Sequence, residues 1–443
     1  MLSRSFRRLL CPPRRLVVAA RPFGDKPLPF NGASGNQEAR PFMEGNPWRT
    51  ISAVTFVLGS LATMMLGYNP GKEAVKDTKA VAIKLLGPLA LVPLRLEDCT
   101  VESKIADTKF VKRPAIEEVI REAVYSSKPT FYHIVYGAKG VGKSSLVERV
   151  AAGRKGVVQI YVGSADKIET ITADFMEKVT GQAVTFKIEP LRAALIEYTE
   201  NMKTKAQVKA MNTGDGGSQV EGDFIPTIIF DVDRGEEGSS NHKDVLQQVR
   251  SLAKGIYDVC NCIVIVSEAN AVFEFGYDDR ENFIYVDEMT FEETNEFLIG
   301  QMAYITGKNT IRAPLTDEDH KKIYNNVGGN PVLLMSLLEK MKTKSLDSCI
   351  EHILVSACAD LAAFKLKPIL KALKEHPEGV EAIYFDGQEY GGVYLSNPKE
   401  VGNAMKSRNA VVYRKDLETA VYQMQSIKYK NALRRYEPYG PKP

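Results

Sequence analysis

The chain has 443 residues, 44% of them hydrophobic and 26% charged, with a formal net charge of +3. This length predicts two or three structural units, and the near-neutral charge does not by itself imply a nucleic-acid partner. The six cysteines are scattered and lack metal-ligand spacing, which argues against a zinc site and is typical of free thiols in a reducing compartment.

The first 24 residues are rich in arginine, and the first acidic residue is Asp25. Arginines interleaved with Leu, Phe and Val form a cationic amphipathic helix at a membrane surface, which is typical of a mitochondrial presequence. We therefore expect residues 1–24 to be a presequence and 25–49 to be a flexible linker. The alternative is a basic tail with no targeting role.

Residues 50–68 contain no charged residue and are about long enough to cross a bilayer core. They predict a single transmembrane helix, and the presequence makes the mitochondrial inner membrane its expected location. Lysines after the span favour the matrix side for the remaining chain, although the opposite side stays open. Gly59, Thr63 and Gly67 form a small-residue stripe that suits pairing with another span, as in a homo-oligomer. The alternative is a buried helix of a soluble domain.

After a connecting segment at 69–108, apolar runs alternate with helical patterns. This alternation predicts an α/β fold with three layers, in which helices cover a buried parallel sheet. Helical patterns then fill 290–345, and residues 346–443 mix helices with short β-like pieces before a basic, tyrosine-rich end. The runs expected to be strands are 131–136, 157–162, 227–232, 262–267 and 283–289, and the later β-like pieces are "AIYF", "GVYLS" and "AVVYR".

The stretch "GAKGVGKSS" matches G-x-x-x-x-G-K-[ST], with an apolar run before it and a helical pattern after it. Glycines let such a loop wrap a phosphate chain, so that backbone amides and the helix N-terminus face the anion. Lys143 adds a positive charge, and Ser144 offers a hydroxyl to Mg²⁺. The predicted ATP-binding residues of this loop are Gly137, Ala138, Lys139, Gly140, Val141, Gly142, Lys143, Ser144 and Ser145.

A magnesium site also needs an acid at the end of a neighbouring strand. Asp231 in "TIIFDVDRG" suits that role together with Ser144, whereas Val232 stands where many ATPases carry a glutamate that polarises water. Asp233, two residues on, would lie on the same side of a continuing strand and is our candidate for orienting the water. Alternatively Asp233 caps the following loop, or Asp231 itself polarises water and Phe230 takes the metal position.

Two further positions complete the predicted catalytic set. Ser267 follows the apolar run 262–266 and is expected to hydrogen-bond the γ-phosphate or the water, with Asn270 as the alternative. Arg280 precedes the last predicted strand, where its charge would reach a phosphate on a neighbouring subunit. The alternative for Arg280 is an ordinary salt-bridged arginine in a loop.

The P-loop at 137–144, the strand with Asp231 at its end and the polar strand end at Ser267 together resemble the ASCE division of P-loop ATPases. This resemblance implies a five-stranded sheet. "NNVGGNPVLLMSLL" resembles the G-x-P segment of the STAND and archaeal-ATPase-like branch of AAA+ proteins, at Gly329, Asn330 and Pro331. The resemblance implies that Pro331 opens a lid helix near the nucleotide, and that Arg113 in "FVKRPAIEEVI" lies near the base or the lid. It also implies that a winged-helix domain follows. Val232 departs from the family pattern and puts the rate of hydrolysis in doubt.

The function expected from this resemblance is a membrane-anchored, slow ATPase that couples Mg–ATP to conformational change on protein partners. One alternative is a switch or scaffold that binds ATP and rarely hydrolyses it. A mitochondrial nucleic-acid-handling protein that uses the winged helix is a less favoured alternative. A P-loop kinase is disfavoured, because the lid carries G-x-P and no basic phosphoacceptor cluster is evident.

Overall fold

The computed structural model describes residues 88–103, 110–163, 166–213, 224–232, 242–266, 280–306, 315–364, 366–396, 400–401, 411–414 and 421–435. All of them belong to one compact unit, Asn69–Pro443. The predicted presequence, linker and transmembrane helix lie outside these ranges. Within the ranges, no helix combines the length and the hydrophobicity that a membrane span requires.

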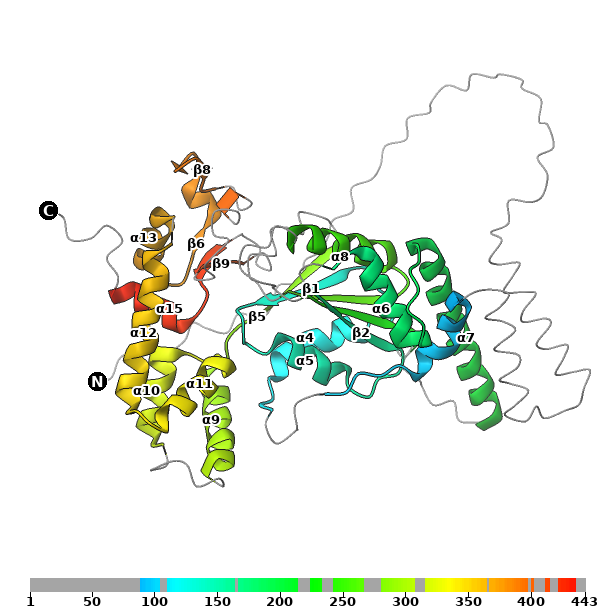
Figure 1. Cartoon of the computed structure of the whole chain (residues 1–443), viewed down its shortest axis with the longest axis horizontal. Helices are drawn as coiled ribbons and strands as arrows, with labels where there is room; N and C mark the ends of the chain where they lie inside the picture. The colour runs from blue at the N-terminus through cyan, green and yellow to red at the C-terminus, as the bar shows by residue number, and fades with distance from the viewer. Residues whose placement is uncertain are drawn as a thin grey trace, which may run out of the picture. The chain divides into compact units, whose positions relative to one another are not determined.

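A five-stranded parallel sheet forms the centre of the ATPase-like core, as predicted (Figure 1). Its strand order is β2-β3-β4-β1-β5, so each successive strand is reached through a crossover connection. The observed strands β2 and β3 coincide with the predicted runs, while β1, β4 and β5 are each displaced by one or more residues. The strands are β1 (Tyr132–Gly137), β2 (Val157–Val162), β3 (Thr227–Val232), β4 (Asn261–Val266) and β5 (Glu281–Val286).

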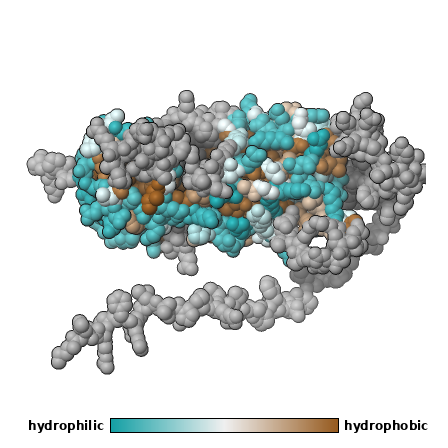
Figure 2. Space-filling view, turned by 90° about the horizontal axis from the view of Figure 1, so that it is seen from below, coloured by the Kyte–Doolittle hydropathy of each residue, from teal (hydrophilic) through white to brown (hydrophobic). Residues whose placement is uncertain are grey.

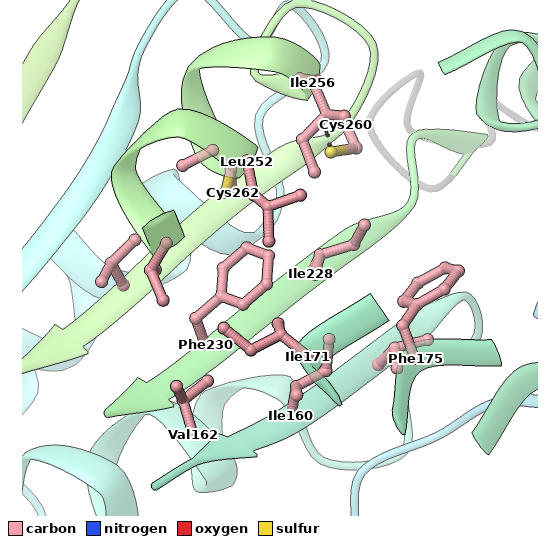
Figure 3. Packing of buried hydrophobic residues seen from close by; sticks show 14 of the residues in the cluster. Ile160, Val162, Ile171, Phe175, Ile228, Phe230, Leu252, Ile256, Cys260 and Cys262 are labelled. Atoms are coloured by element: carbon pink, nitrogen blue, oxygen red, sulfur yellow. Dashed lines mark hydrogen bonds between the residues drawn. The ribbon is translucent and has the colours of Figure 1, made fainter. Parts of the chain in front are cut away.

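Helices cover both faces of this sheet. On one face, α4 and α5 bury alternate strand residues such as Val135, Ile229 and Ile265. On the other, α6, α7 and α8 pack on Ile160, Phe230 and their neighbours (Figure 3). Because side chains alternate along a strand, the apolar residues of β3 serve both cores. The helices are α4 (Pro114–Val124), α5 (Lys143–Ala151), α6 (Ile168–Thr180), α7 (Ile188–Thr213) and α8 (His242–Ile256).

A short helical segment precedes the core. It consists of η1 (Pro88–Leu91), α3 (Val92–Arg95) and η2 (Leu96–Asp98). Val92 and Leu96 are fully buried in the same cluster as α6 to α8. The apolar residues around position 92 therefore pack into the protein core.

A second cluster of helices follows β5 and fills the region predicted to be the lid. Its core includes Leu298, Ile323, Leu334 and the first half of α12. The lid was predicted to end at residue 345. That boundary separates α12 from the residues of α9 to α11 with which its first half packs. The helices are α9 (Phe291–Thr306), α10 (Asp317–Val327), α11 (Pro331–Met341) and α12 (Leu346–Ala362).

The C-terminal region has its own core, built on the second half of α12. A three-stranded antiparallel sheet of order β6-β10-β9 packs with helices here, and β7 and β8 form a separate hairpin. The elements are α13 (Lys367–Glu375), β6 (Val380–Glu381), η6 (Ala382–Phe385), β7 (Glu389–Tyr390), β8 (Val393–Tyr394), β9 (Val411–Arg414), β10 (Val421–Met424) and α15 (Ile427–Arg435).

One local prediction for this region was wrong. The piece "AIYF" is the 3₁₀ helix η6, whereas we expected a β-like segment. Ala382 and Phe385 are buried while the two residues between them are exposed. A spacing of three fits the 3₁₀ repeat, and a strand would have alternated. On the face seen from below in Figure 2, the described surface is mainly hydrophilic, with hydrophobic residues in small groups.

Candidate nucleotide site

The predicted phosphate-binding loop connects β1 to α5 at the carboxyl edge of the sheet. β1 ends at Gly137, and α5 begins at Lys143. Gly140 and Gly142 have φ angles of 85° and 91°, in the left-handed region where only glycine is unstrained. The two glycines turn the loop into the first turn of α5. Helix N-terminal amides at such a turn form an anion site.

Lys143 is 6% exposed, and its ammonium donates to the carbonyl oxygens of Gly137 at 3.1 Å and Ala138 at 2.8 Å. Burial lowers the pKa of Lys143 to about 8, against an opposing influence from the Asp231 carboxylate. The Lys143 ammonium is therefore hydrogen-bonded to neutral carbonyl oxygens, and the Asp231 carboxylate adds an electrostatic attraction. An incoming phosphate would give this ammonium a stronger partner.

Asp231 on β3 faces the loop across the sheet edge. The hydroxyl of Ser144 donates to Asp231 Oδ1 at 3.2 Å, which brings the two predicted metal ligands together. A hydroxyl and a carboxylate are the oxygen ligands that Mg²⁺ prefers, so these side chains fit such an ion. Phe230, by contrast, is 3% exposed in the core on the other face of the sheet (Figure 3). That position makes Phe230 unsuitable as an alternative metal residue.

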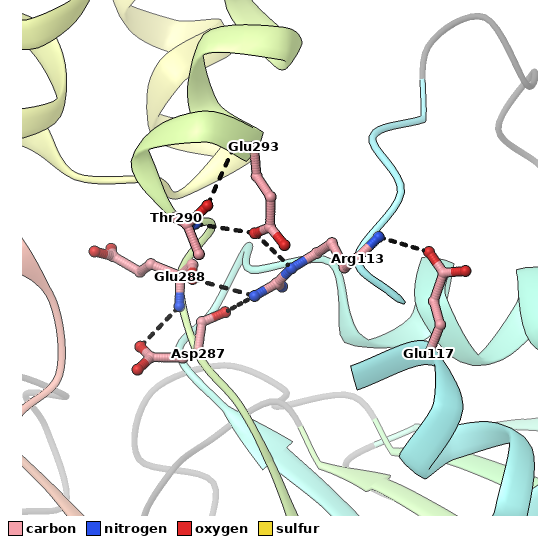
Figure 4. A network of polar contacts seen from close by, with 6 residues as sticks. All are labelled: Arg113, Glu117, Asp287, Glu288, Thr290 and Glu293. Carbon is pink, nitrogen blue, oxygen red and sulfur yellow. Dashed lines mark hydrogen bonds and ion pairs between the residues drawn. The ribbon is translucent and has the colours of Figure 1, made fainter. Parts of the chain in front are cut away.

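Arg113 lies just before α4 and contacts the start of the lid (Figure 4). Its Nε donates to Glu293 of α9 at 3.1 Å, and Nη2 donates to the carbonyl oxygens of Asp287 and Glu288, each at 3.1 Å. Its Nη1 is buried and has no hydrogen-bond partner among the described residues. The structure therefore puts Arg113 against the segment that connects β5 to α9, residues 287–290, which we call the lid hinge. This agrees with a place near the lid.

The turn before α11 touches the phosphate-binding loop. The Asn330 amide donates to the carbonyl oxygen of Lys139 at 2.8 Å, while its own oxygen accepts the N–H groups of Val332 and Leu333. Asn330 is thus the N-cap of α11, and Pro331 is its first residue. A Cβ added at Gly140 would lie 2.9 Å from Asn330 Oδ1, so the loop and the lid are in close contact.

Of the remaining predicted catalytic residues, only Arg280 lies in the part of the chain that the structure describes, and it does not join this cluster. Asp233, Ser267 and Asn270 lie outside the described residues. Arg280 precedes β5 at the opposite, amino edge of the sheet, where its carbonyl accepts the Tyr132 N–H. Its guanidinium lies over the Tyr257 ring at 5.3 Å. A contact between Arg280 and a neighbouring subunit stays a prediction.

Three polar residues at or near the site were missed from the sequence. Gln159 interrupts the apolar run of β2 and contacts Asp231, and Glu148 follows Ser144 by one turn of α5. A lone amide inside an apolar strand was the available signal for Gln159. Glu288 is 8% exposed at the lid hinge, and burial raises its pKa to about 7. Nothing in the sequence distinguished Glu288 from other acids near strand ends.

A model of the family described as "ATPase domain predominantly from Archaea" matches residues 115–337, about half of the chain. The chain belongs to this family. The match begins in α4 and ends in α11, so it includes the P-loop, Asp231 and Asn330. The observed five-stranded parallel sheet is the sheet expected for a P-loop ATPase.

Relatives of this ATPase domain occur in Methanocaldococcus jannaschii. One uncharacterised ATP-binding protein is 24% identical over 378 residues, which covers 74% of this chain and 99% of the relative. Another is 25% identical over 300 residues, which covers 61% of this chain and 79% of the relative.

Among solved structures, the chain is similar to a STAND protein with a tetratricopeptide repeat sensor from Pyrococcus horikoshii. The identity is 16% and the TM-score 0.31, covering 75% of this chain and 44% of that one. Drosophila ORC bound to DNA gives 10% identity and a TM-score of 0.30, covering 78% and 92%.

Proposed function

We propose that this chain is a membrane-anchored mitochondrial ATP-binding protein, and that it acts as a slow ATPase of the STAND-like type. Binding and hydrolysis of Mg–ATP would change the position of the lid and the C-terminal region, which act on protein partners. ATP as the nucleotide agrees with the names of the archaeal relatives. The observation that carries the proposal is the hydrogen bond from Asn330 to Lys139, because it connects the phosphate loop directly to the lid.

Each component of the loop has a defined task in this proposal. The backbone amides at the start of α5 and the Lys143 ammonium bind the phosphates. Ser144 and Asp231 would hold Mg²⁺, which supplies charge neutralisation on the phosphate oxygens when bound. Arg113 and Asn330 keep the lid hinge close to the loop, so that a change at the phosphates alters the contacts of the lid.

Slow turnover is the expected consequence of Val232. This side chain is fully buried with the apolar residues of the α6–α8 face and supplies no acid to polarise water. We propose Asp233 as the residue that orients the water in its place, with Ser267 supporting the γ-phosphate. If neither acts in this way, the same site serves as a nucleotide-gated switch that binds ATP and does not hydrolyse it.

The C-terminal region is the proposed output of the nucleotide site. Helix α12 contributes to the lid core and also to the C-terminal core. The Ile427 N–H at the start of α15 donates to Glu288 at the lid hinge at 3.1 Å. A movement of the lid would therefore be transmitted to the β6-β10-β9 sheet. We propose a winged-helix-like domain here, since a three-stranded antiparallel sheet beside helices is compatible with one.

Turnover by the purified full-length chain tests the enzymatic proposal. We expect slow ATP hydrolysis that is lost in Lys143→Ala along with ATP binding. In Asp233→Ala we expect hydrolysis to be lost while ATP binding is kept. A wild-type rate no higher than that of Lys143→Ala, with ATP still bound tightly, would establish the switch instead.

Localisation needs a separate measurement. Protease protection of the endogenous chain in intact and swollen mitochondria would show on which side the ATPase domain lies. The lysines that follow residue 68 favour the matrix side. Extraction by alkaline carbonate would contradict the predicted span, since a transmembrane helix stays in the membrane under that treatment.

A further inference from the structure

Gln159 is a buried amide on β2, next to the strand that carries Asp231. Its exposure is 7%, and it pairs in register with Ile229 on β3. Val158 and Ile160, which flank it, point into the α6–α8 core. Because side chains alternate, Gln159 points to the other face, where α5 packs and where Asp231 meets Ser144.

The Gln159 amide donates to two carboxylates at once. Its Nε2 lies 3.0 Å from Glu148 Oε1 and 3.4 Å from Asp231 Oδ2. Ser144 occupies the other oxygen of Asp231, and Ser144 and Glu148 lie one turn apart on α5. The contacts therefore form a closed ring that runs from α5 through β3 and β2 and back to α5.

This ring fixes the orientation of the Asp231 carboxylate. A carboxylate that is held at one oxygen only can rotate, whereas Asp231 is held at both. The donor is neutral, so it directs Asp231 without adding a cation that would compete with a metal ion. Glu148, 4% exposed and also bonded by the Tyr161 hydroxyl at 3.0 Å, holds the amide in place.

We infer that Gln159 is a positioning residue for divalent-cation binding. It orients Asp231 so that Oδ1 faces Ser144 and the ion that accompanies the nucleotide. This inference rests on the proposed Mg–ATP function and extends it to a residue that does not itself contact the nucleotide. Its specific consequence is that Gln159 affects the metal-dependent part of nucleotide affinity and leaves the metal-independent part unchanged.

The test compares nucleotide affinity in Mg²⁺ with affinity in EDTA, with a fluorescent ATP analogue and the full-length chain. Gln159→Leu keeps the volume and removes the amide. We expect its gain in affinity from Mg²⁺ to fall about tenfold, the equivalent of one hydrogen bond to a charged group. Its affinity in EDTA should equal that of the wild type.

Tyr161→Phe is the matched control, because it lies on the same strand and loses a hydrogen bond to Glu148, while the hydrogen bond from Gln159 to Asp231 is retained. We expect its Mg²⁺ gain to stay within about twofold of the wild type, since the Asp231 bonds are retained. If Mg²⁺ raised the nucleotide affinity of Gln159→Leu by as much as that of the wild type, the inference would be overturned. An equal loss in Mg²⁺ and in EDTA would also overturn it, since that indicates a general effect on the loop.

A second measurement does not depend on nucleotide. Gln159→Leu, Asp231→Ala and the double variant are unfolded in urea without ATP. If the two side chains interact, the shift in midpoint of the double variant differs from the sum of the single shifts. Additive shifts would overturn the inference. Equal nucleotide affinity of the wild type and Lys143→Ala would instead refute the proposed function.

Discussion

Asn330 Nδ2 donates to the carbonyl oxygen of Lys139 over 2.8 Å, although the two residues are 191 positions apart in the chain. The same side chain caps α11 through its oxygen. Replacing Asn330 by Asp keeps the cap and puts a carboxylate against the Lys139 carbonyl. In the wild type, ATP should protect the lid from limited proteolysis. In Asn330→Asp we expect the lid helix to persist and this protection by ATP to be lost.

Asn330→Ala is the companion variant, because it removes both the cap and the donor. Its thermal unfolding should show an additional loss of about 1 kcal/mol relative to Asn330→Asp, the usual value of an N-cap. If ATP protects the Asp variant as well as it protects the wild type, the Asn330–Lys139 contact does not couple the loop to the lid.

Local sequence was sufficient for the strands and the phosphate loop. The runs 157–162 and 227–232 are apolar, bounded and short, so their residues alone indicate buried strands, and the structure has β2 and β3 there. The Ser144–Asp231 contact followed from the rule that parallel strands end at one edge. In "AIYF" the run was too short for its period to be resolved, and a 3₁₀ turn was mistaken for a strand.

Long-range side-chain contacts could not be predicted in this way. Arg113 and Glu293 are 180 positions apart, and their ion pair depends on how the lid folds back onto α4. Gln159 and Asp231 meet because β2 and β3 are neighbours in the sheet. Strand order is a property of the whole fold, and hydrophobic periodicity contains no information on it. The roles of Gln159 and Glu288 therefore became visible only in three dimensions.

Lys143 should make ATP binding pH-dependent. Burial lowers its pKa to about 8 in the chain without nucleotide, whereas a phosphate partner favours the charged form. Above pH 8 the amine must take up a proton when ATP binds, so affinity falls as pH rises. We expect a loss of about tenfold between pH 7 and pH 9 by titration calorimetry.

Lys143→Arg provides the control, because a guanidinium keeps its charge throughout that range. Its affinity for ATP should be independent of pH between 7 and 9, whatever its absolute value. A wild-type profile as flat as that of Lys143→Arg would contradict the lowered pKa.

Glu288 should make stability pH-dependent at the lid hinge. Burial raises its pKa from 4.5 to about 7, opposed by the Ile427 N–H and by Lys428 and Lys430. Since the folded-state pKa lies above the unfolded one, the stabilisation is complete below pH 4.5 and is lost as pH rises through 7. Glu288→Gln should therefore unfold like the wild type at pH 4.5 and be more stable at pH 8, by up to about 3 kcal/mol.

The Gln variant retains an oxygen that accepts the Ile427 N–H, so its contact with α15 is preserved. Urea unfolding at the two pH values measures the difference. The same gain at both pH values would mean that packing is responsible and that titration of Glu288 is not.

The Arg113–Glu293 ion pair should contribute far more to stability than an exposed ion pair within α4. Its side chains are 9% and 18% exposed, and the guanidinium also holds two hinge carbonyls. Removal of one partner from a buried pair costs about 3–5 kcal/mol, which we expect for Arg113→Met in urea unfolding.

The control is Arg121→Met. The side chains of Arg121 and its partner Glu118 are 51% and 66% exposed, so this pair should contribute less than about 0.5 kcal/mol. Equal effects of the two substitutions would refute a structural role of Arg113 at the hinge.

Gly329 is required by the close approach of two backbone segments. A Cβ there would lie 2.1 Å from the Met289 carbonyl oxygen and 2.8 Å from its carbon and nitrogen, and the Met289 N–H donates to the Gly329 carbonyl at 3.1 Å. Backbone atoms cannot move aside as a flexible side chain would, so Gly329→Ala must separate the turn from the hinge. We expect a loss of about 2–3 kcal/mol in thermal unfolding, together with weaker ATP binding, because Asn330 moves with the turn.

Gly300→Ala on α9 is the control, because the added Cβ has open space around it. It should instead stabilise the chain by about 1 kcal/mol. If Gly329→Ala were as stable as Gly300→Ala, the turn and the hinge would not be in contact in solution.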